Sequence, residues 1–329
     1  MKRLLLLVAF VLAACGSPSE SVPAALPATP QADIATPTVT VVAAVPTIAP
    51  RTEVTVTDGA GRSVVLKQPV NRIVSLAPST TEIVTALDGL ARLTAIDMYS
   101  DYPTEVSTLP KITNPDMSVD YEQITALAPD VVYAAGITAP EVIAAIEKLG
   151  IPVVVVGAPN ATFASVLADI QLVGVTLQRD TEAQTLTETM QTEWQSLADR
   201  VAKTTDRPTV FWELDATDPA KPYTVGPDSF VAELLAVAGG TNIFADVTDA
   251  YPQVSLEQIV AKAPDTIILA DSLWGVTPES VATRAGWEAI PAVQNQRVFP
   301  IDDNVVSRPG PHIVQGLQAV VAVLHPELK

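Results

Sequence analysis

Residues 122–130 read Glu-Gln-Ile-Thr-Ala-Leu-Ala-Pro-Asp, and residues 257–265 read Glu-Gln-Ile-Val-Ala-Lys-Ala-Pro-Asp. Seven of the nine positions are identical, although the two stretches start 135 residues apart. Each ends in Ala-Pro-Asp, where proline stops a short helix, and an apolar run typical of a strand follows. Solenoid repeats are much shorter than this spacing, so the sequence predicts two related lobes rather than a solenoid.

Each copy begins with the signals of a helix N-terminus. Asp120 or Ser255 can cap the helix, and a glutamine stands three residues later, which is the spacing of a capping box. Glu122 and Glu257 therefore fall in the first turn of their helices. A glutamate there can simply complement the helix dipole. Because it occurs at corresponding places in two lobes, the repeat equally indicates a paired docking surface.

The N-terminus has the features of a bacterial lipoprotein signal. Lys2-Arg3 precede an apolar stretch, Leu4–Leu12, that is too short to span a bilayer as a stable helix. It runs into Leu-Ala-Ala-Cys-Gly, so we expect residues 1–14 to be a signal peptide and Cys15, the only cysteine, to be lipidated. An ordinary signal peptide with a chance cysteine is the alternative. We expect a lipid-anchored, extracytoplasmic protein tethered to a bacterial cell membrane rather than embedded in it.

Residues 15–50 differ in composition from the rest of the chain. Seven prolines lie among Ala, Thr, Val and Ser, and Glu20 and Asp33 are the only charged residues. Such a composition cannot bury a core, so we expect a disordered, partly polyproline-like spacer.

The overall charge narrows the choice of partners. The formal net charge is −18, from 37 acidic and 19 basic residues. The chain has no basic cluster, so it is a poor candidate for binding nucleic acid or anionic lipid.

Apolar strands alternate with helices after residue 50, which favours parallel sheets covered by helices on both sides. A helical pattern without Gly or Pro runs from about Asp180 to Lys203. At 1.5 Å per residue it spans roughly 35 Å, enough to bridge two lobes. We expect an α/β fold with a first lobe over 51–179, an interlobe helix over 180–204 and a second lobe over 205–329. The predicted strands are 54–57, 63–66, 72–76, 93–96, 131–134, 153–156, 208–214, 266–270 and 297–301, and the other predicted helices include 140–149, 162–178, 229–237 and 312–324.

Candidate ligand residues follow the predicted strands, because ligands of open α/β sheets bind beyond the strand ends. Aromatic residues make up only 5% of the chain, and in such loops they offer flat surfaces for a macrocycle or an aromatic chelate. Each could instead be ordinary packing, and Trp194 and Trp287 are expected to pack. The candidates are Ser79, Thr80, Tyr99, Tyr102, Trp212, Glu213, Tyr251 and Arg308, with Tyr223 and Trp274 as further possibilities.

The order of several short motifs resembles that of the cobalamin and iron-siderophore substrate-binding proteins of ABC importers, over about residues 51–329. The resemblance implies two Rossmann-like lobes with mostly parallel sheets, joined by one long rigid helix, with the ligand between them. It also implies that Glu122 and Glu257 dock onto arginines of a permease that works with an ATPase, and that the protein is a monomer without a cofactor. The motifs are Arg72–Glu82, Tyr99–Pro103, the two repeats, and residues 225–229, 239–246 and 251–255.

The family members that bind cobalamin resemble the chain most, in the motifs at 99–103 and 251–255. Two tryptophans of those members correspond to the stretch 114–117 and to Tyr251 in this chain. Their acidic residues near the position of Arg308 correspond to Asn304 and Ser307, although Asp302 and Asp303 lie close by in the sequence. A cobalamin-type corrinoid is the expected ligand, with a ferric siderophore or haem as alternatives. Haem would need a Tyr or His axial ligand, and His312 and His325 are the only histidines of the chain.

Enzyme signatures are missing from the sequence. It contains no Gly-x-Ser-x-Gly elbow, and no Cys–His pair is left once Cys15 is lipidated. The repeated glutamates lie in separate lobes, too far apart to act on one bond. A His-rich zinc or manganese site is not expected, since the chain has two histidines. A binding protein is therefore favoured over a lipoprotein hydrolase or an adhesin.

Overall fold

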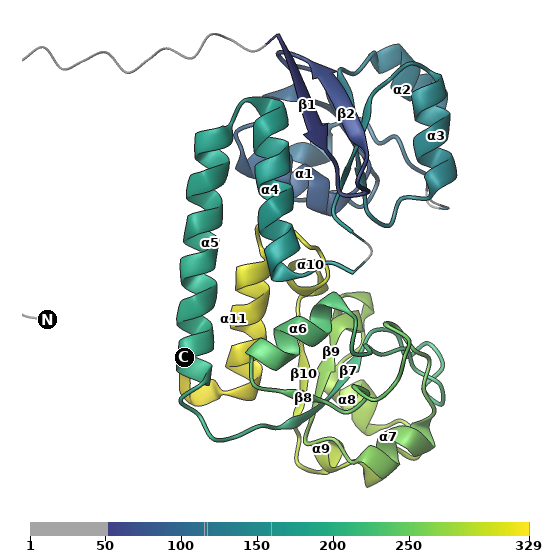
Figure 1. Cartoon of the computed structure of the whole chain (residues 1–329). Coiled ribbons are helices and arrows are strands. Elements are labelled where there is room, and N and C mark those ends of the chain that lie inside the picture. The colour runs from purple at the N-terminus through teal and green to yellow at the C-terminus, as the bar shows by residue number, and fades with distance from the viewer. Residues whose placement is uncertain (1–51, 115, 117, 159, 329) are drawn as a thin grey trace, which may run out of the picture. The chain divides into compact units, whose positions relative to one another are not determined.

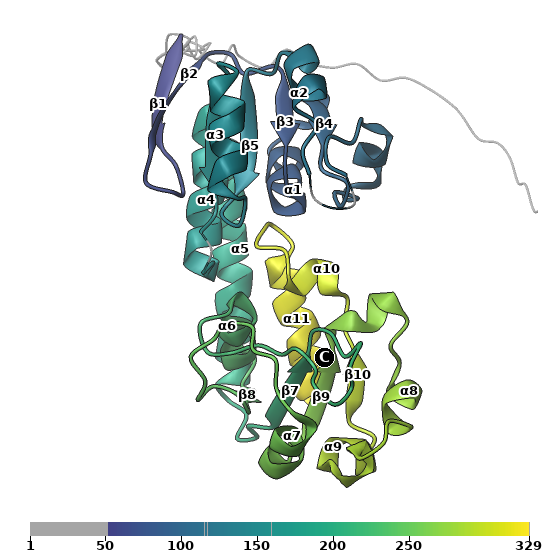
Figure 2. The ribbon, with the colours of Figure 1, turned by 90° about the vertical axis from the view of Figure 1, so that its right-hand side faces the viewer.

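Two four-stranded parallel sheets form the centre of this computed structural model, which describes residues 52–114, 116, 118–158 and 160–328. The first sheet has the order β4-β3-β5-β6 and the second the order β10-β9-β7-β8 (Figures 1 and 2). The strands are mostly buried, as expected of parallel sheets covered on both faces. Their bounds are Ile73–Ser75 (β3), Leu93–Ile96 (β4), Val131–Ala135 (β5), Val153–Val156 (β6), Thr209–Glu213 (β7), Thr241–Asn242 (β8), Thr266–Leu269 (β9) and Val298–Pro300 (β10).

The two sheets share one topology. In each lobe the first strand lies between the second and the third, and the fourth strand lies at the edge beside the third. Strands β3 to β6 therefore correspond one by one to β7 to β10. The prediction of two related α/β lobes is confirmed.

The repeated sequence forms equivalent helices, α2 (Tyr121–Leu127) and α7 (Leu256–Lys262). Each helix has a side-chain cap, and the second has a complete capping box. Each ends at an alanine in the left-handed conformation, with φ of 43° at Ala128 and 47° at Ala263. An alanine rarely adopts this conformation, so the surrounding structure must hold it there in both lobes.

The aspartate at the end of each repeat ties the helix to the neighbouring strand. Oδ2 of Asp130 accepts the backbone N–H groups of Asn71 and Arg72, just before β3. Oδ2 of Asp265 accepts the backbone N–H and the hydroxyl of Thr209, the first residue of β7. The identical Ala-Pro-Asp therefore has the same role in both lobes: its aspartate fixes the end of the helix beside the first strand of the lobe.

Shorter elements complete the lobes. An antiparallel hairpin of β1 (Glu53–Thr57) and β2 (Ser63–Lys67) contacts α4. The first lobe also contains α1 (Pro78–Ala86), α3 (Pro140–Lys148) and α4 (Phe163–Leu177). The second contains α6 (Phe230–Val237), α8 (Pro278–Ala282), α9 (Pro291–Gln294), α10 (Asp303–Val306) and α11 (Ile313–Leu324), and the 3-10 turns are Leu90–Arg92, Thr104–Thr108, Ala270–Trp274, Trp287–Ala289 and Pro326–Leu328.

One long helix, α5 (Asp180–Val201), follows α4 and precedes the second sheet. It lies against α4 on one side of the fold and against α11 further along (Figure 1). Its buried face repeats every three or four residues, through Ala183, Thr187, Met190, Trp194, Leu197 and Val201. The ring of Trp194 stacks on Phe163 of α4 at 4.0 Å, so this tryptophan packs, as expected.

The largest apolar core does not stop at the boundary between the lobes. It runs from the first sheet through α4 and α5 to α6 and α11 in the second lobe. A polar contact lies beside it, since the backbone N–H of Phe163 at the start of α4 donates to Glu233 of α6 at 2.7 Å. The lobes are therefore joined by packing as well as by the helix.

Candidate functional site

A cavity of about 510 Å³ lies between the lobes, with walls from both. Its volume is in the range of about 300–1,000 Å³ that is usual for ligand sites. The first-lobe wall uses the segments after all four strands: Ala77–Ser79 after β3, Tyr99 after β4, Gly136-Ile137 after β5 and Gly157-Ala158 after β6. Parallel strands bring their carboxyl ends to one edge of the sheet, so these segments converge.

The second-lobe wall is built in the same way. Phe230 lies after β7, Tyr251 after β8 and Trp274 after β9, and residues 303–309 follow β10. Both sheets therefore present their carboxyl ends to one cavity, which is the arrangement that the sequence predicted for a ligand held between lobes.

Large apolar side chains of the cavity are open to solvent. Ile137 and Trp274 are each 82% exposed, and Tyr99 and Tyr251 are 43% and 47% exposed. Tyr99 and Ile137 come from the first lobe and Tyr251 and Trp274 from the second, and all four line the cavity. Exposed apolar surface at a concave site marks a place where a ligand or partner binds.

Asp169 is a buried carboxyl group in the cavity wall. It lies in the middle of α4 and is only 7% exposed. Its Oδ1 accepts the backbone N–H of Gly157 at 2.9 Å, while Oδ2 has no hydrogen-bond partner among the described residues. Burial raises the pKa of Asp169 to about 6, although the Gly157 N–H lowers it. The free oxygen is available to a donor on a ligand.

Arg308 lies in the cavity wall but is already paired. Its Nη1 is 2.7 Å from Oδ1 of Asp101 and 3.1 Å from Oε1 of Glu82, both in the first lobe. Burial lowers the pKa of Arg308, but the hydrogen bonds to Asp101 and Glu82 together outweigh it and the pKa is raised. His312 adds a second contact to the same group, with Nδ1 2.8 Å from Oε2 of Glu82.

Asp303 is the third charged side chain in the wall. It accepts the hydroxyl of Ser307, one turn later. Burial raises the pKa of Asp303, while the Ser307 hydroxyl and Arg308 lower it in part. In the sequence analysis, Asp303 is only a neighbour of Asn304 and Ser307, the positions that correspond to acidic residues of the cobalamin-binding members.

Four predicted ligand residues do not line this cavity. Thr80 is fully buried, within hydrogen-bond distance of Ser75 Oγ at 2.6 Å and donating to the carbonyl of Ala77 at 2.9 Å. Trp212 is fully buried within β7, and its indole N–H has no hydrogen-bond partner among the described groups. Tyr102 is half exposed but lies edge-on against His312, with ring centroids 4.2 Å apart. Thr80 lies in α1 and Trp212 in β7, and the periodicity of these elements turns both side chains away from the cavity.

Glu213, the fourth, belongs to a buried charged group in the second lobe. It forms two hydrogen bonds with Arg284, at 2.6 and 2.8 Å, and it is fully buried. Burial raises the pKa of Glu213 to about 7, and contact with the carboxyl group of Asp271 adds to the shift. Oδ1 of Asp271 is buried without a hydrogen-bond partner among the described groups, and burial raises the pKa of Asp271 as well.

The described residues contain neither a candidate metal cluster nor a candidate membrane-spanning helix. In this part of the chain, His, Cys, Asp and Glu side chains form no group of three or more that could hold a metal ion. None of the helices described is both long and apolar enough to cross a membrane. Cys15 and the expected signal peptide and spacer, residues 1–14 and 15–50, lie outside the described residues.

Residues 73–305 match the model of a protein family described as periplasmic binding protein. An ABC transporter substrate-binding lipoprotein of Bacillus subtilis, YvrC, is 32% identical over 280 residues, covering 83% of this chain and 86% of that protein. The chain belongs to the periplasmic binding protein family. It is thus a substrate-binding protein of an ABC transporter and not an enzyme.

Solved structures agree with the fold of this binding protein. The periplasmic vitamin B12-binding protein BtuF of Vibrio cholerae has a TM-score of 0.68 and 26% identity, over 79% of this chain and 99% of that one. The haem-binding protein RhuT of Roseiflexus sp. RS-1 has a TM-score of 0.70 over 79% of this chain and 100% of that one, but its 24% identity indicates the fold alone.

The repeated glutamates of the binding protein are exposed. Glu122 and Glu257 lie in the first turns of α2 and α7, and both side chains are open to solvent. In Figures 1 and 2 the two helices lie at opposite ends of the lobes, one in each.

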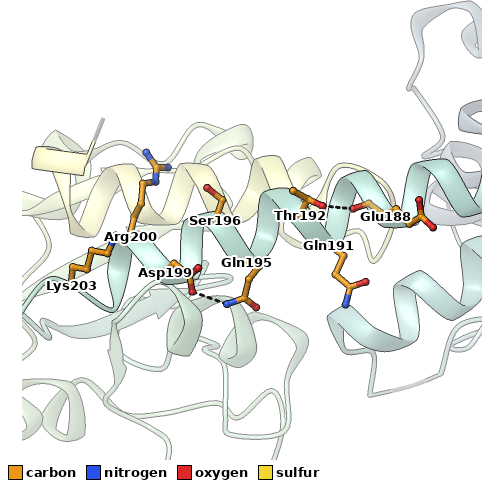
Figure 3. Close-up of a pocket in the computed structure, with 8 residues that line it drawn as sticks. All are labelled: Glu188, Gln191, Thr192, Gln195, Ser196, Asp199, Arg200 and Lys203. Carbon is orange, nitrogen blue, oxygen red and sulfur yellow. Dashed lines mark hydrogen bonds between the residues drawn. The ribbon is translucent and has the colours of Figure 1, made fainter.

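A larger hollow on the binding protein is not a ligand site of the same kind. It measures about 830 Å³ and follows the outer face of α5 (Figure 3). Its lining residues all come from α5 or from Lys203 just after it, so a single helix provides every wall and cannot enclose a ligand. The cavity between the lobes is smaller, but two lobes enclose it.

Sequence reasoning missed two side chains of the site, Ile137 and Asp169. Ile137 follows β5, but it is aliphatic, and the prediction rested on aromatic side chains in such loops. Asp169 is the only charged residue within Phe163–Leu177, a helix that is otherwise mostly apolar. A single carboxyl group in such a helix was a signal that could have been used, since buried charges have a partner or a function.

Proposed function

We propose that this binding protein is the extracytoplasmic component of an ABC importer that captures a cobalamin-type corrinoid between its lobes. The observation that carries the proposal is the pair of apolar walls, with Tyr99 and Ile137 on one side and Tyr251 and Trp274 on the other. A flat macrocycle between such walls would bury both of its faces. The similarity to the vitamin B12-binding protein of Vibrio cholerae supports the same class of ligand.

A ferric siderophore or haem is the second candidate. The phenol groups of Tyr99 and Tyr251 line the cavity and could ligate a haem iron. The two histidines favour haem less, because His312 contacts Glu82 and Tyr102 and His325 is fully buried, and neither lines the cavity.

Titration of the purified protein with cyanocobalamin, cobinamide, hemin and ferric chelates tests the proposal. Isothermal calorimetry and quenching of tryptophan fluorescence give the affinities. We expect a single site that binds a corrinoid tighter than about 1 μM, or roughly 8 kcal/mol. If hemin or a ferric chelate binds more tightly than either corrinoid, the corrinoid proposal is wrong and the tighter ligand takes its place in the proposed function.

Delivery to the membrane is the second half of the proposed function. Glu122 and Glu257 are proposed to contact basic side chains of the permease, one from each lobe. Their exposure and their equivalent positions at the starts of α2 and α7 support this role. An ordinary contribution to the helix dipole remains the competing interpretation.

The arrangement at the membrane is also a proposal. Lipidation at Cys15 and a spacer over residues 15–50 would tether a monomer to the extracytoplasmic side of a bacterial membrane. The similarity to a lipoprotein of Bacillus subtilis supports it. Lobe boundaries at 51–179 and 205–329, on either side of a helix over 180–204, fit the positions of the two sheets and of α5.

A further inference from the structure

We infer that the cavity selects its ligand by charge, with Asp169 and Asp303 accepting hydrogen bonds from a neutral or cationic, amide-bearing ligand and repelling anionic chelates. The inference rests on the proposed function and names the chemistry of the ligand that the same site would take.

Asp169 has the geometry of an acceptor held ready for a ligand. It is 93% buried, and its Oδ1 is fixed by the backbone N–H of Gly157 at the end of β6. Its other oxygen, Oδ2, has no hydrogen-bond partner in the described part of the chain, and the residue lines the cavity. Oδ2 is therefore an acceptor that faces the cavity, and a ligand donor would form a charge-assisted hydrogen bond with it there.

Among the described residues of the wall, the one basic side chain does not offset this acidity. Arg308 is the cation among the three charged lining side chains, and Asp101 and Glu82 of the first lobe already hold it. Counting these partners, one positive charge lies among four negative ones near the cavity. An incoming carboxylate would have to compete with two existing ion pairs for Arg308.

The N-terminus of α1 makes the electrostatic potential in the cavity more positive, but its effect is weaker than that of the two carboxylates. Ala77–Ser79 line the cavity, and a helix N-terminus is equivalent to about half a positive charge. Glu82 lies one turn further along the same helix and reduces that potential. The two carboxyl groups of the wall therefore dominate the field that a ligand meets.

This charge pattern separates the candidate ligands by their chemistry. A corrinoid carries several peripheral amide groups, whose N–H donors suit a buried carboxylate. Haem carries two propionates, and catecholate ferric chelates are trianions, so both would place like charges beside Asp169 and Asp303. A ferric hydroxamate with an ammonium arm is cationic and would be accepted more readily than they are.

Two probe pairs that differ in charge test the inference on the full-length protein. The first pair is cyanocobalamin and its monocarboxylate, in which one propionamide has become a propionate. The second is cationic ferrioxamine B and an anionic ferric tris-catecholate. We expect the neutral or cationic member of a pair to bind at least about tenfold more tightly, the scale of one hydrogen bond to a charged group. Asp169→Asn should reduce this preference severalfold by weakening the preferred member.

Asp199→Asn is the matched control, because it removes the same charge from the outer face of α5 (Figure 3). It should leave the preference unchanged. Equal or tighter binding of the anionic member, an unaltered preference in Asp169→Asn, or no binding of any of the four probes would overturn the inference. If ferrioxamine B alone binds and Asp169→Asn weakens it, the corrinoid proposal fails while the charge selection stands.

Discussion

The carboxylate of Glu82 in the first lobe lies 3.1 Å from the guanidinium of Arg308 in the C-terminal segment. The Glu82 side chain is 3% exposed and that of Arg308 is 14% exposed. The pair connects lobes that the covalent chain joins only through α5, and it does so at the edge of the ligand cavity. Glu82 is thus both a stability element and a determinant of the charge in the site.

Removing the charge of Glu82 should destabilise the protein. Breaking a buried ion pair by removing one partner typically costs about 3–5 kcal/mol. Arg308 is partly exposed and keeps its second partner, Asp101, so we expect a smaller loss than this range, about 2–3 kcal/mol, for Glu82→Gln. Urea denaturation gives the free energy of unfolding. Glu193→Gln on the exposed face of α5 is the control, and an equal effect of both variants would contradict the role of the pair.

Aromatic contacts from both lobes should contribute to ligand affinity. Tyr99→Ala and Tyr251→Ala should each weaken ligand binding by about 1–2 kcal/mol, the scale of one lost aromatic contact. Both side chains are nearly half exposed, so the thermal midpoint without ligand should change little. Calorimetric titration and differential scanning give the two quantities on the same samples. Early melting with normal affinity would mean that the tyrosines support the fold instead.

Ligand affinity should fall in mildly acidic solution. The pKa of Asp169 is raised to about 6 by burial, and a ligand that donates to its carboxylate competes with the proton. Binding should therefore be about tenfold weaker at pH 5 than at pH 7, as follows from one titrating group with that pKa. The neighbouring Asp303 titrates in the same direction, while Arg308 stays charged throughout.

Asp169→Asn provides the test of this pH dependence. Its affinity should vary less between pH 5 and pH 7, leaving only the contribution of Asp303. A variant that kept the full wild-type dependence would show that the titrating group lies elsewhere.

The second lobe should lose stability as the pH rises through neutrality. The pKa of Glu213 is raised to about 7 mainly by burial, from an ordinary value of 4.5, so between these values the folded state binds a proton that the unfolded state has released. Stability linked to this proton is present below pH 4.5 and is lost as the pH passes 7. Urea midpoints at pH 6 and pH 8 measure the loss. Glu213→Gln should be less stable at pH 6 but should show a flatter dependence.

Permease docking can be separated from ligand binding. Glu122→Ala and Glu257→Ala should change the free energy of unfolding by only about 0.3–1 kcal/mol each, because exposed glutamates at helix starts contribute little. At an interface, losing one partner of a desolvated charge pair costs about 2–5 kcal/mol. The double variant should therefore abolish ligand-stimulated ATP hydrolysis in reconstituted membranes while ligand affinity stays normal. Normal uptake by the double variant would falsify the docking role.

The sequence predicted the fold closely because its signals are local. The strands at Leu93–Ile96 and Val153–Val156 have the predicted bounds, and the long helix ends at Val201, three residues before the predicted end at 204. Apolar runs and helix caps lie within or next to the elements that they define, so the bounds of these strands and helices can be predicted from nearby residues alone. The repeat at 122–130 and 257–265 then indicated that one topology is used twice.

The site was less predictable because side-chain direction depends on packing. Position after a strand correctly identified Tyr99, Tyr251 and Arg308 as residues near the cavity, but the same argument included Trp212, which faces the core from within β7. Asp169 was missed because it lies in a helix rather than after a strand. The pairing of Arg308 with the first lobe depends on residues more than 200 positions apart, which no local pattern encodes.

The Glu82 contacts also determine when the first lobe can finish folding relative to the synthesis of the chain. Arg308 and His312 follow Glu82 by 226 and 230 residues, so almost the whole polypeptide must be made before this acidic side chain meets its partners. A partly synthesised first lobe would have to bury an unpaired carboxylate or leave that helix loosely packed. The packing of α1 in the first lobe is therefore expected to be complete only after the C-terminal segment has been made.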